Sequence, residues 1–248
     1  MNGTGIEWLT PDWPAPPAAR ACSTLRRGGV SSGPHASLNL ATHVGDREAN
    51  VTENRRRMRL AAGLPAEPLW LSQVHGAMVI RHESAAGPSP QADAAVAFEP
   101  GRVCAVMTAD CLPVVLVDRD ATRIAVSHAG WRGLAGGVLE ATIAALAVPA
   151  TSLLAWLGPA ISQQSFEVGP EVRDAFLRLS PQFDAGFIAN ARGRHQADLY
   201  ALARITLARA GVETVYGGGW CTLREAERFY SFRRDGTTGR MATLAWLA

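Results

Sequence analysis

Short apolar runs separated by turn residues dominate the centre of the chain, and they limit the possible folds more than any other feature. Each run is long enough for a strand and too short for a helix, and most are rich in valine and other strand-forming residues. The runs cover residues 69–71, 78–80, 94–98, 103–107, 112–117 and 124–126, and similar runs recur at 153–157, 212–216 and 241–246. The sequence therefore predicts a sheet-rich core.

Helical patterns surround these runs. The spacing of apolar residues predicts helices near 48–60, 131–146, 171–179 and 197–209. Helices and strands do not alternate in a strict βαβ repeat, so we expect an α+β fold in which a mixed sheet is packed by helices.

The domain organisation follows from length and from the N-terminal residues. Four prolines between residues 9 and 21 predict an extended N-terminal segment over 1–22, and the Arg/Gly/Ser-rich stretch 23–33 has the composition of a loop. The chain has 248 residues, of which 48% are hydrophobic, which is enough for one large core. We expect residues 23–248 to form a single domain.

Composition excludes several classes of protein. Four cysteines without a CxxC pair argue against a disulfide scaffold or a zinc ribbon. The 24 basic and 22 acidic residues are too balanced to indicate a nucleic-acid partner, and the absence of lysine excludes Schiff-base and P-loop chemistry. No signal peptide or membrane-spanning stretch of about 18 apolar residues is evident, so we expect a cytoplasmic protein.

Three potential metal ligands occur in unusual local contexts. His75 precedes a glycine, Cys111 follows Asp110 between two apolar runs, and His128 lies at the end of a predicted strand. Two imidazoles and one thiolate would leave a fourth coordination position open, as in catalytic zinc sites, so we predict Zn²⁺ here and regard copper as the less favoured metal. Each residue also has an ordinary interpretation: a surface-turn histidine, an inert buried thiol and a hydrogen-bonded core histidine.

Arginines mark candidate anion-binding positions. Arg132 lies in a Gly-Trp-Arg-Gly turn that opens the predicted helix, where free backbone N–H groups and the guanidinium could together bind phosphate or carboxylate. Arg26 and Arg233 belong to arginine pairs in glycine-bearing loops, which could either clamp phosphate or form solvated faces. The aromatic residues Phe229, Tyr230 and Phe232 suit the stacking of a base, and His43 lies in a candidate site loop.

Seven segments in order resemble the YfiH-like family, which also carries the names multicopper polyphenol oxidase (laccase) and peptidoglycan editing factor. These segments are RGGVS (27–31), SLNL (37–40), HVGD (43–46), QVHG (73–76), TADCLP (108–113), HAGWRG (128–133) and FYSFRRDG (229–236). Ser72 and Ala41 depart from the family pattern, where Asn and Gly are common.

The resemblance implies a single-domain α+β fold with a zinc site formed by His75, Cys111 and His128. It also implies a purine nucleoside enzyme that uses phosphate to split adenosine, inosine, guanosine or methylthioadenosine, and that deaminates adenosine. Its partners would be purine nucleosides and phosphate, with neither nucleic acid nor membrane involved.

Individual roles are then expected as follows. In deamination, water activated by zinc would attack the purine C6, with Asp110 as a candidate proton shuttle. In phosphorolysis, Arg132 and the helix N-terminus are candidate phosphate ligands, with Arg26 or Arg233 assisting. The predicted catalytic set is Asp110, Cys111, His128 and Arg132, and the predicted substrate- or phosphate-binding set is Arg26, Asn39, His43, Arg132 and Arg233.

Three alternatives remain open at this level. A cysteine amidase acting on cell-wall precursors could use Cys111 with one of the two histidines. A multicopper oxidase needs many paired histidines, whereas this chain has six and no His-x-His. A metal-stabilised module that binds a nucleotide or a protein without catalysis is the third. The oligomeric state does not follow from the sequence.

Overall fold

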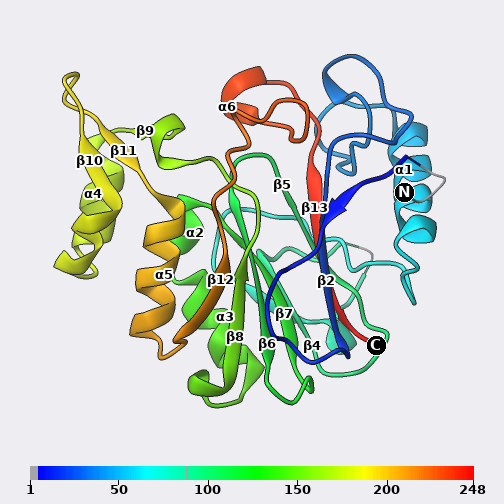
Figure 1. The fold of residues 1–248 in the computed structure, drawn as a ribbon. Helices are drawn as coiled ribbons and strands as arrows, with labels where there is room; N and C mark the ends of the chain where they lie inside the picture. The colour runs from blue at the N-terminus through cyan, green and yellow to red at the C-terminus, as the bar shows by residue number, and fades with distance from the viewer. Residues whose placement is uncertain (1–4, 88) are drawn as a thin grey trace.

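Two β-sheets packed face to face form the centre of the molecule (Figure 1). The computed structural model describes residues 5–87 and 89–248, so the first four residues of the predicted N-terminal segment lie outside it. The smaller of the two sheets is antiparallel throughout. Its order is β1 (Trp8–Leu9), β2 (Ala19–Thr24), β13 (Met241–Leu247) and β5 (Cys104–Thr108).

The larger sheet has six strands and is mixed. Its outer pairs, β12 with β8 and β3 with β4, are parallel, while the inner pairs are antiparallel. The order is β12 (Thr214–Gly217), β8 (Leu153–Leu157), β6 (Leu112–Asp118), β7 (Ile124–Ala129), β4 (Ala94–Ala97) and β3 (Val79–Arg81). The prediction of a mixed sheet packed by helices is confirmed.

A small antiparallel sheet lies at the left of Figure 1, beside α4 (Pro170–Leu177). Its order is β10 (Phe187–Ala189), β11 (His195–Ala197) and β9 (Glu167–Val168).

Helices cover the outer faces of the two main sheets. α3 (Val138–Leu146) and α5 (Leu199–Arg209) pack on the six-stranded sheet, and α1 (Glu48–Ala61) packs on the four-stranded sheet (Figure 1). Short helices complete the fold: α2 (Trp131–Ala135), α6 (Phe232–Asp235) and 3-10 turns at Gly33–His35, His82–Ser84, Ala150–Ser152, Gln163–Ser165 and Pro181–Gly186. Within the described ranges, no helix has the length and apolar character needed to cross a membrane.

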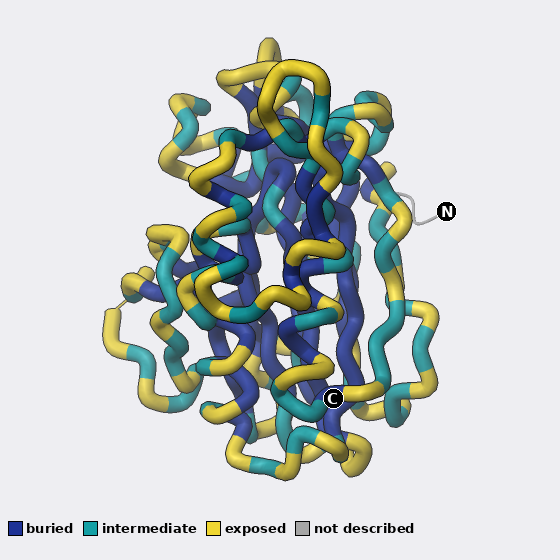
Figure 2. Tube along the Cα trace, turned by 90° about the vertical axis from the view of Figure 1, so that its left-hand side faces the viewer, coloured by how far each residue is buried: buried dark blue, intermediate teal, exposed yellow. Residues whose placement is uncertain are grey.

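The side chains of β6 explain why both faces of the large sheet are covered. Val114 and Leu116 point into the core under the helices, whereas Val115 and Val117 point into the core between the sheets. Every residue of β6 is buried, so this strand reads as a continuous apolar run rather than an alternating one. The interior strands appear as the dark blue centre of the tube in Figure 2.

The structure differs from the predicted elements in a few places. The expected helix over 131–146 is two helices, because Gly137 adopts a φ of +86° between α2 and α3. The run 69–71 forms only an isolated bridge from Leu69 to Cys104. The extended N-terminal segment includes β1 and continues into β2, which ends at Thr24 inside the expected loop. The very short strands β9, β10 and β11 had no periodic signal in the sequence.

Candidate active site

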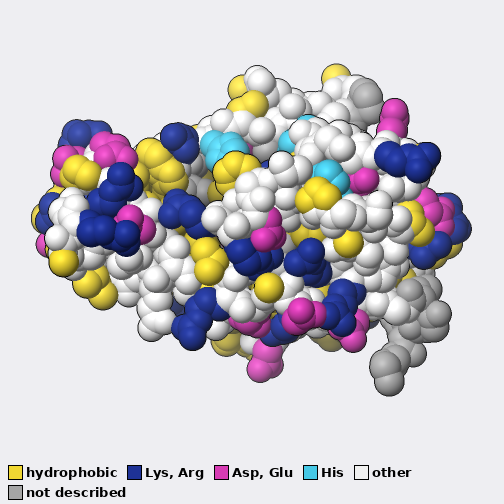
Figure 3. Space-filling model, turned by 90° about the horizontal axis from the view of Figure 1, so that it is seen from above, with side chains coloured by type: hydrophobic (Ala, Val, Ile, Leu, Met, Phe, Trp, Pro, Cys, Tyr) yellow, Lys and Arg dark blue, Asp and Glu magenta, His cyan; other side chains and the backbone are white. Residues whose placement is uncertain are grey.

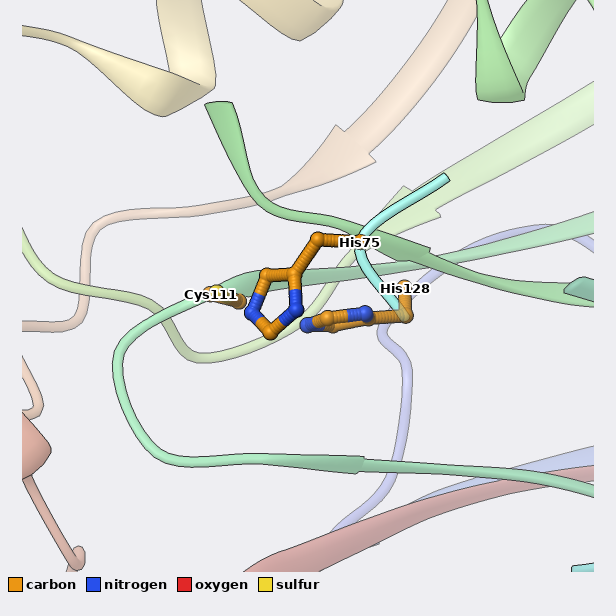
Figure 4. Close-up of side chains that lie close together, drawn as sticks. All are labelled: His75, Cys111 and His128. Carbon is orange, nitrogen blue, oxygen red and sulfur yellow. The ribbon is translucent and has the colours of Figure 1, made fainter. Parts of the chain in front are cut away.

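The three predicted metal ligands meet where the two main sheets come together. Cys111 lies in the turn that carries the chain from β5 in one sheet to β6 in the other, and His128 lies near the end of β7. His75 lies in the loop before β3 (Figure 4). Their ligand atoms all fall within 4.8 Å of one another, and the two imidazole rings stand 4.7 Å apart at 73°. The three side chains expected to form a tripod therefore lie close enough together to hold one metal ion.

A buried carboxylate organises two of the three ligands. Asp93, which precedes β4 and is fully buried, accepts a hydrogen bond from His128 Nδ1 through Oδ1 at 2.8 Å. The same oxygen accepts from the backbone N–H of His75 at 2.9 Å, and Oδ2 accepts from the N–H of Gly76 at 2.7 Å. Sequence reasoning missed this residue, and only its position before a buried strand could have drawn attention to it.

The contact with Asp93 determines which ring nitrogen of His128 faces the other two side chains of the cluster. Since Nδ1 is engaged by the carboxylate, Nε2 is the ring nitrogen left to face the other ligands. This carboxylate–histidine arrangement is common behind metal-binding histidines, because it orients the ring and makes it a better donor.

Electrostatics favour a thiolate at Cys111. Burial alone would raise the pKa of this thiol, but the adjacent His128 and His75 outweigh burial and lower it. Conversely, burial would lower the pKa of His128, but Cys111 and Asp93 raise it. Thiolate is the form of cysteine that binds metal and that acts as a nucleophile.

The backbone adopts unusual conformations at two positions of the site. His75 has a φ of +62° and Asp110 a φ of +95°, both in a region that non-glycine residues seldom occupy. Hydrogen bonds hold both in place: Asp93 binds the loop at His75, and Asp110 accepts from Thr222 Oγ1 at 2.6 Å and from Arg233 N at 2.7 Å. Each ligand-bearing turn is therefore fixed by buried polar contacts.

Gln73 holds the loop that carries His75, and Gly130 leaves space for the side chains of Cys111 and His75. The Gln73 amide exchanges two hydrogen bonds with the backbone of Met107, which joins the His75 loop to β5. A Cβ atom on Gly130 would lie 2.7 Å from Cys111 Sγ and 3.6 Å from the His75 ring. Only glycine at position 130 leaves space for this arrangement of ligands.

A cavity of about 310 Å³ opens above the ligands. Seen from above, histidine side chains lie on this side of the molecule close to apolar and arginine side chains (Figure 3). Such a volume accommodates a small organic ligand. Besides the three ligands, the lining includes His43, Gln73, Met107, Thr108, Ala109, Asp110, Trp131, Arg132, Ile161, Phe166, Leu199, Phe232, Arg233 and Arg240.

The predicted arginines differ in their relation to the cavity. Arg132 and Arg233 both line it and are exposed, with the Arg132 guanidinium 4.4 Å from the centre of the Trp131 ring and Arg233 Nη1 donating to the Glu167 carbonyl. Arg26 is not among the lining residues: its guanidinium donates to the carbonyls of Ala36 and Ala226.

Asn39 and His43 also have distinct positions. His43 lies at the exposed rim of the cavity, where burial, Arg240 and Arg55 lower its pKa. Asn39 is fully buried and does not line the cavity, but its Oδ1 accepts from the backbone N–H of Arg240 at 3.0 Å. Asn39 therefore contacts the site through Arg240, a lining residue that sequence reasoning did not single out.

The aromatic segment near the C-terminus separates into core and cavity residues. Phe229 and Tyr230 are fully buried, and the Tyr230 hydroxyl donates to the His35 carbonyl at 2.6 Å. Phe232 is instead 58% exposed and lies at the cavity. Of the three aromatics considered for base stacking, Phe232 alone has an available face.

Comparison with known sequences adds an independent line of evidence. A family model described as multi-copper polyphenol oxidoreductase laccase matches residues 20–248. A Pseudomonas aeruginosa protein named purine nucleoside phosphorylase is 54% identical over 243 residues, covering 97% of this chain and 98% of that protein. The purine nucleoside phosphorylase YfiH of Escherichia coli is 50% identical over 239 residues, covering 96% and 98%.

Solved structures agree in fold. A Neisseria meningitidis protein superposes with a TM-score of 0.94 at 52% identity, covering 97% of this chain and 98% of that one. YlmD from Geobacillus stearothermophilus gives 0.92 at 31% identity, covering 100% and 97%. Fold and site together define a mixed α/β protein with a three-ligand cluster at the floor of a cavity. The chain belongs to the YfiH family, that of the laccase-like model above.

Proposed function

We propose that this protein is a zinc-dependent purine nucleoside enzyme. It would use phosphate to split adenosine, inosine, guanosine or methylthioadenosine into the free base and the sugar 1-phosphate, and it would also deaminate adenosine. The observation that carries the proposal is one cavity that combines the His75–Cys111–His128 cluster with arginines and an exposed aromatic ring. Relatives at 50% identity or more named purine nucleoside phosphorylase support it.

The donor set fits zinc. Two imidazoles and a thiolate, with the His128 ring oriented by Asp93, match the ligands that zinc takes in catalytic sites. Zinc bound there would supply Lewis-acid chemistry, polarising an oxygen or activating water. A multicopper oxidase would need further clusters, and within the described residues His75, Cys111 and His128 are the one group of this kind.

The cavity walls suit a nucleoside. Phe232 offers a ring face on which a purine can stack, and Trp131 lies on the α2 side of the same cavity. Phe166 and Ile161 give the cavity an apolar wall. These groups would hold the base, while the His75–Cys111–His128 cluster at the floor of the cavity would face the sugar and the attacking group.

Two reactions follow from this placement. In phosphorolysis, a phosphate oxygen bonds to the anomeric carbon while the carbon–nitrogen bond breaks and the electron pair leaves with the purine. The proton that the phosphate loses balances the one that the purine nitrogen gains. In deamination, water adds at the purine C6 and ammonia leaves. Arginines at the cavity stabilise the phosphate and its developing charge in the first reaction.

We assign Asp110 a positioning role in both reactions. Its two carboxylate oxygens already accept hydrogen bonds from Thr222 and from the Arg233 backbone, so it orders the Cys111 turn and α6. The proton-shuttle role considered from the sequence stays open beside this one, because each carboxylate oxygen keeps a second lone pair and Asp110 lines the cavity.

A metal-analysed preparation incubated with adenosine, with and without phosphate, tests the proposal. Adenine should form only with phosphate, and inosine should form in both reactions. H75A and C111S should lose bound metal and both activities, while H195A, a histidine outside the cavity, should retain them. Turnover by metal-free protein would contradict the zinc requirement.

A cysteine amidase acting on cell-wall precursors is the second candidate, because one observation favours it. Cys111, His128 and Asp93 form a thiol–imidazole–carboxylate series of the kind that activates cysteine nucleophiles. In that case added zinc would inhibit amide hydrolysis, and C111A would abolish turnover in a chelator as well as in zinc. Zinc-stimulated nucleoside turnover would exclude it.

A further inference from the structure

Arg240 occupies a special position in the cavity. It immediately precedes β13, whose first residue, Met241, pairs with Thr108 at the end of β5. Arg240 is therefore next in the chain to the residue that pairs with Thr108, and both Arg240 and Thr108 line the cavity. Cys111 and Asp110 line the same cavity.

The Arg240 guanidinium is half-buried and held in place by its neighbours. Nη1 donates to the carbonyls of Thr238 at 2.9 Å and Gly239 at 3.0 Å, and the backbone N–H donates to Asn39 Oδ1. Among residues 5–87 and 89–248, no carboxylate lies within salt-bridge distance of Arg240. Nη1 is the only one of its side-chain nitrogens with a hydrogen-bond acceptor in the described parts of the chain.

An arginine in this state is ready to bind an anion. Arg240 is partly withdrawn from solvent, and no carboxylate of the described residues forms an ion pair with it. Interactions between charges are stronger in such a partly desolvated place than on the open surface. The remaining donors of a guanidinium match the oxygens of a phosphate in geometry.

Thr108 provides the second, independent observation. Its hydroxyl is buried, with the residue only 1% exposed, and Oγ1 has no hydrogen-bond partner among the described residues. Buried hydroxyls are almost always paired, so an unpaired one that lines a cavity indicates a ligand that completes the bond. A phosphate oxygen is an acceptor of the required kind.

The other arginines of the cavity are placed differently. Arg132 and Arg233 are exposed, so solvent and salt screen their charges. The Arg132 guanidinium lies over Trp131, and that of Arg233 lies 5.2 Å from the centre of the Phe166 ring. Their positions suit contacts with the nucleoside or the recruitment of anions at the rim.

We infer that Arg240 and Thr108 form the inner phosphate subsite of this cavity. The choice of phosphate, rather than another small oxyanion, rests on the proposed phosphorolysis. The Arg240 guanidinium lies 5.8 Å from the centre of the Phe232 ring, so an anion bound there would sit beside a purine stacked on that ring. Asn39 acts as a positioning residue for this subsite through its bond to the Arg240 backbone.

Direct binding of inorganic phosphate to the metal-loaded protein, measured by calorimetry, tests the inference without relying on turnover. Loss of a charge-assisted hydrogen-bonding group should weaken phosphate binding by about 10- to 100-fold in R240Q. R240K, which keeps the charge but not the fork of donors, should recover part of the affinity. R119Q, at the far end of the large sheet, serves as the surface-charge control and should bind phosphate as the parent does.

T108V distinguishes a loss of phosphate binding from a loss of folding. The Thr108 hydroxyl has no protein partner, so its removal should leave the melting temperature unchanged or raised while phosphate affinity falls by about threefold to tenfold. Unchanged phosphate affinity in folded R240Q and T108V, with the loss found instead in R132Q or R233Q, would overturn the inference. So would a parent protein that binds no phosphate.

The two proposals fail in different ways. If the parent binds phosphate and R240Q does not, but no nucleoside is split, the proposed reaction is wrong and the subsite stands. If nucleosides are split and R240Q keeps the parental KM for phosphate, the reaction stands and the subsite is wrong.

Discussion

At the scale of single residues, the cluster of three candidate metal ligands could be predicted but the residues that support it could not. His75, Cys111 and His128 each occur in a distinctive short segment, and the structure brings them together. Asp93 lies 35 residues before His128 in an otherwise unremarkable alanine-rich stretch. Its role depends on contacts that form only in the folded chain, and so does that of Arg240.

Replacement of Asp93 tests that support. In D93N an NH2 group, which can only donate, replaces one carboxylate oxygen, yet it faces N–H groups from which Asp93 accepts hydrogen bonds. We expect metal affinity to fall by about 10- to 100-fold, as is typical for residues behind a metal ligand. Competition with a chelator of known affinity measures this.

Asp118 supplies a matched control for this variant. It is also a buried aspartate that accepts backbone hydrogen bonds, from Thr122 and Arg123, but it lies at the opposite end of β6. D118N should lose stability without losing metal affinity. Equal metal affinity in D93N and the parent protein would refute the role assigned to Asp93.

Gly130 gives a second test at this scale. Its φ of −64° and ψ of 165° are open to any residue, so a change to alanine acts through the added Cβ alone. That atom would stand 2.7 Å from Cys111 Sγ, so G130A should displace the sulfur and reduce metal affinity by roughly tenfold.

A double-mutant cycle identifies the cause. If the sulfur is what the new methyl group meets, the destabilisation of about 1–3 kcal/mol that overpacking produces should largely disappear when G130A is placed on a C111A background. Urea unfolding of metal-free proteins measures it. A destabilisation equal in both backgrounds would place the clash elsewhere.

At the scale of elements, long periodic segments could be predicted and short or interrupted ones could not. The predicted helix over 48–60 corresponds closely to α1, and the run 112–117 to β6. The pattern over 131–146 is continuous in apolar spacing, but a left-handed glycine divides it, and periodicity carries no information on that. Strands of two or three residues exist because of their partners, so β9 to β11 have no local signal.

The junction between α1 and the loop before it gives a prediction for an element. Asn54 is fully buried in α1: its Oδ1 accepts from Val30 N, and its Nδ2, with two hydrogens, lies within hydrogen-bond distance of three acceptors, Ser31 Oγ and the carbonyls of Ser37 and Asn39. N54A leaves these groups unpaired, so we expect a loss of about 2–4 kcal/mol in the free energy of unfolding.

The same helix contains the control. Asn50 is only partly buried, and its single side-chain contact is a long one of 3.5 Å to Asp46, so N50A should change stability by no more than about 0.5 kcal/mol. Because Asn54 orders the loop that ends at Asn39, N54A should also raise the KM for phosphate. Equal stabilities of the two variants would contradict the anchoring role of Asn54.

At the scale of the whole molecule, the site depends on how the two sheets meet. The turn that carries Cys111 joins β5 of one sheet to β6 of the other, while His128 belongs to the larger sheet and Gln73 ties the His75 loop to the smaller one. The sequence gives the order of these strands along the chain but not which sheet each one joins, because that depends on packing between distant segments. A metal bound by all three ligands therefore links both sheets.

Removal of the metal should then weaken the whole fold rather than one loop. A ligand that binds only the native state stabilises it by about 2.7 kcal/mol at one hundred times its Kd. For a chain of this size, that corresponds to a fall in Tm of about 5 to 10 °C when a chelator removes the metal.

Calorimetry over a series of free zinc concentrations should show Tm rising steadily with zinc in the parent protein, and C111S should show no such rise. If zinc left Tm unchanged while restoring activity, it would bind the folded protein too weakly to join the sheets. Its role would then be confined to chemistry on the substrate.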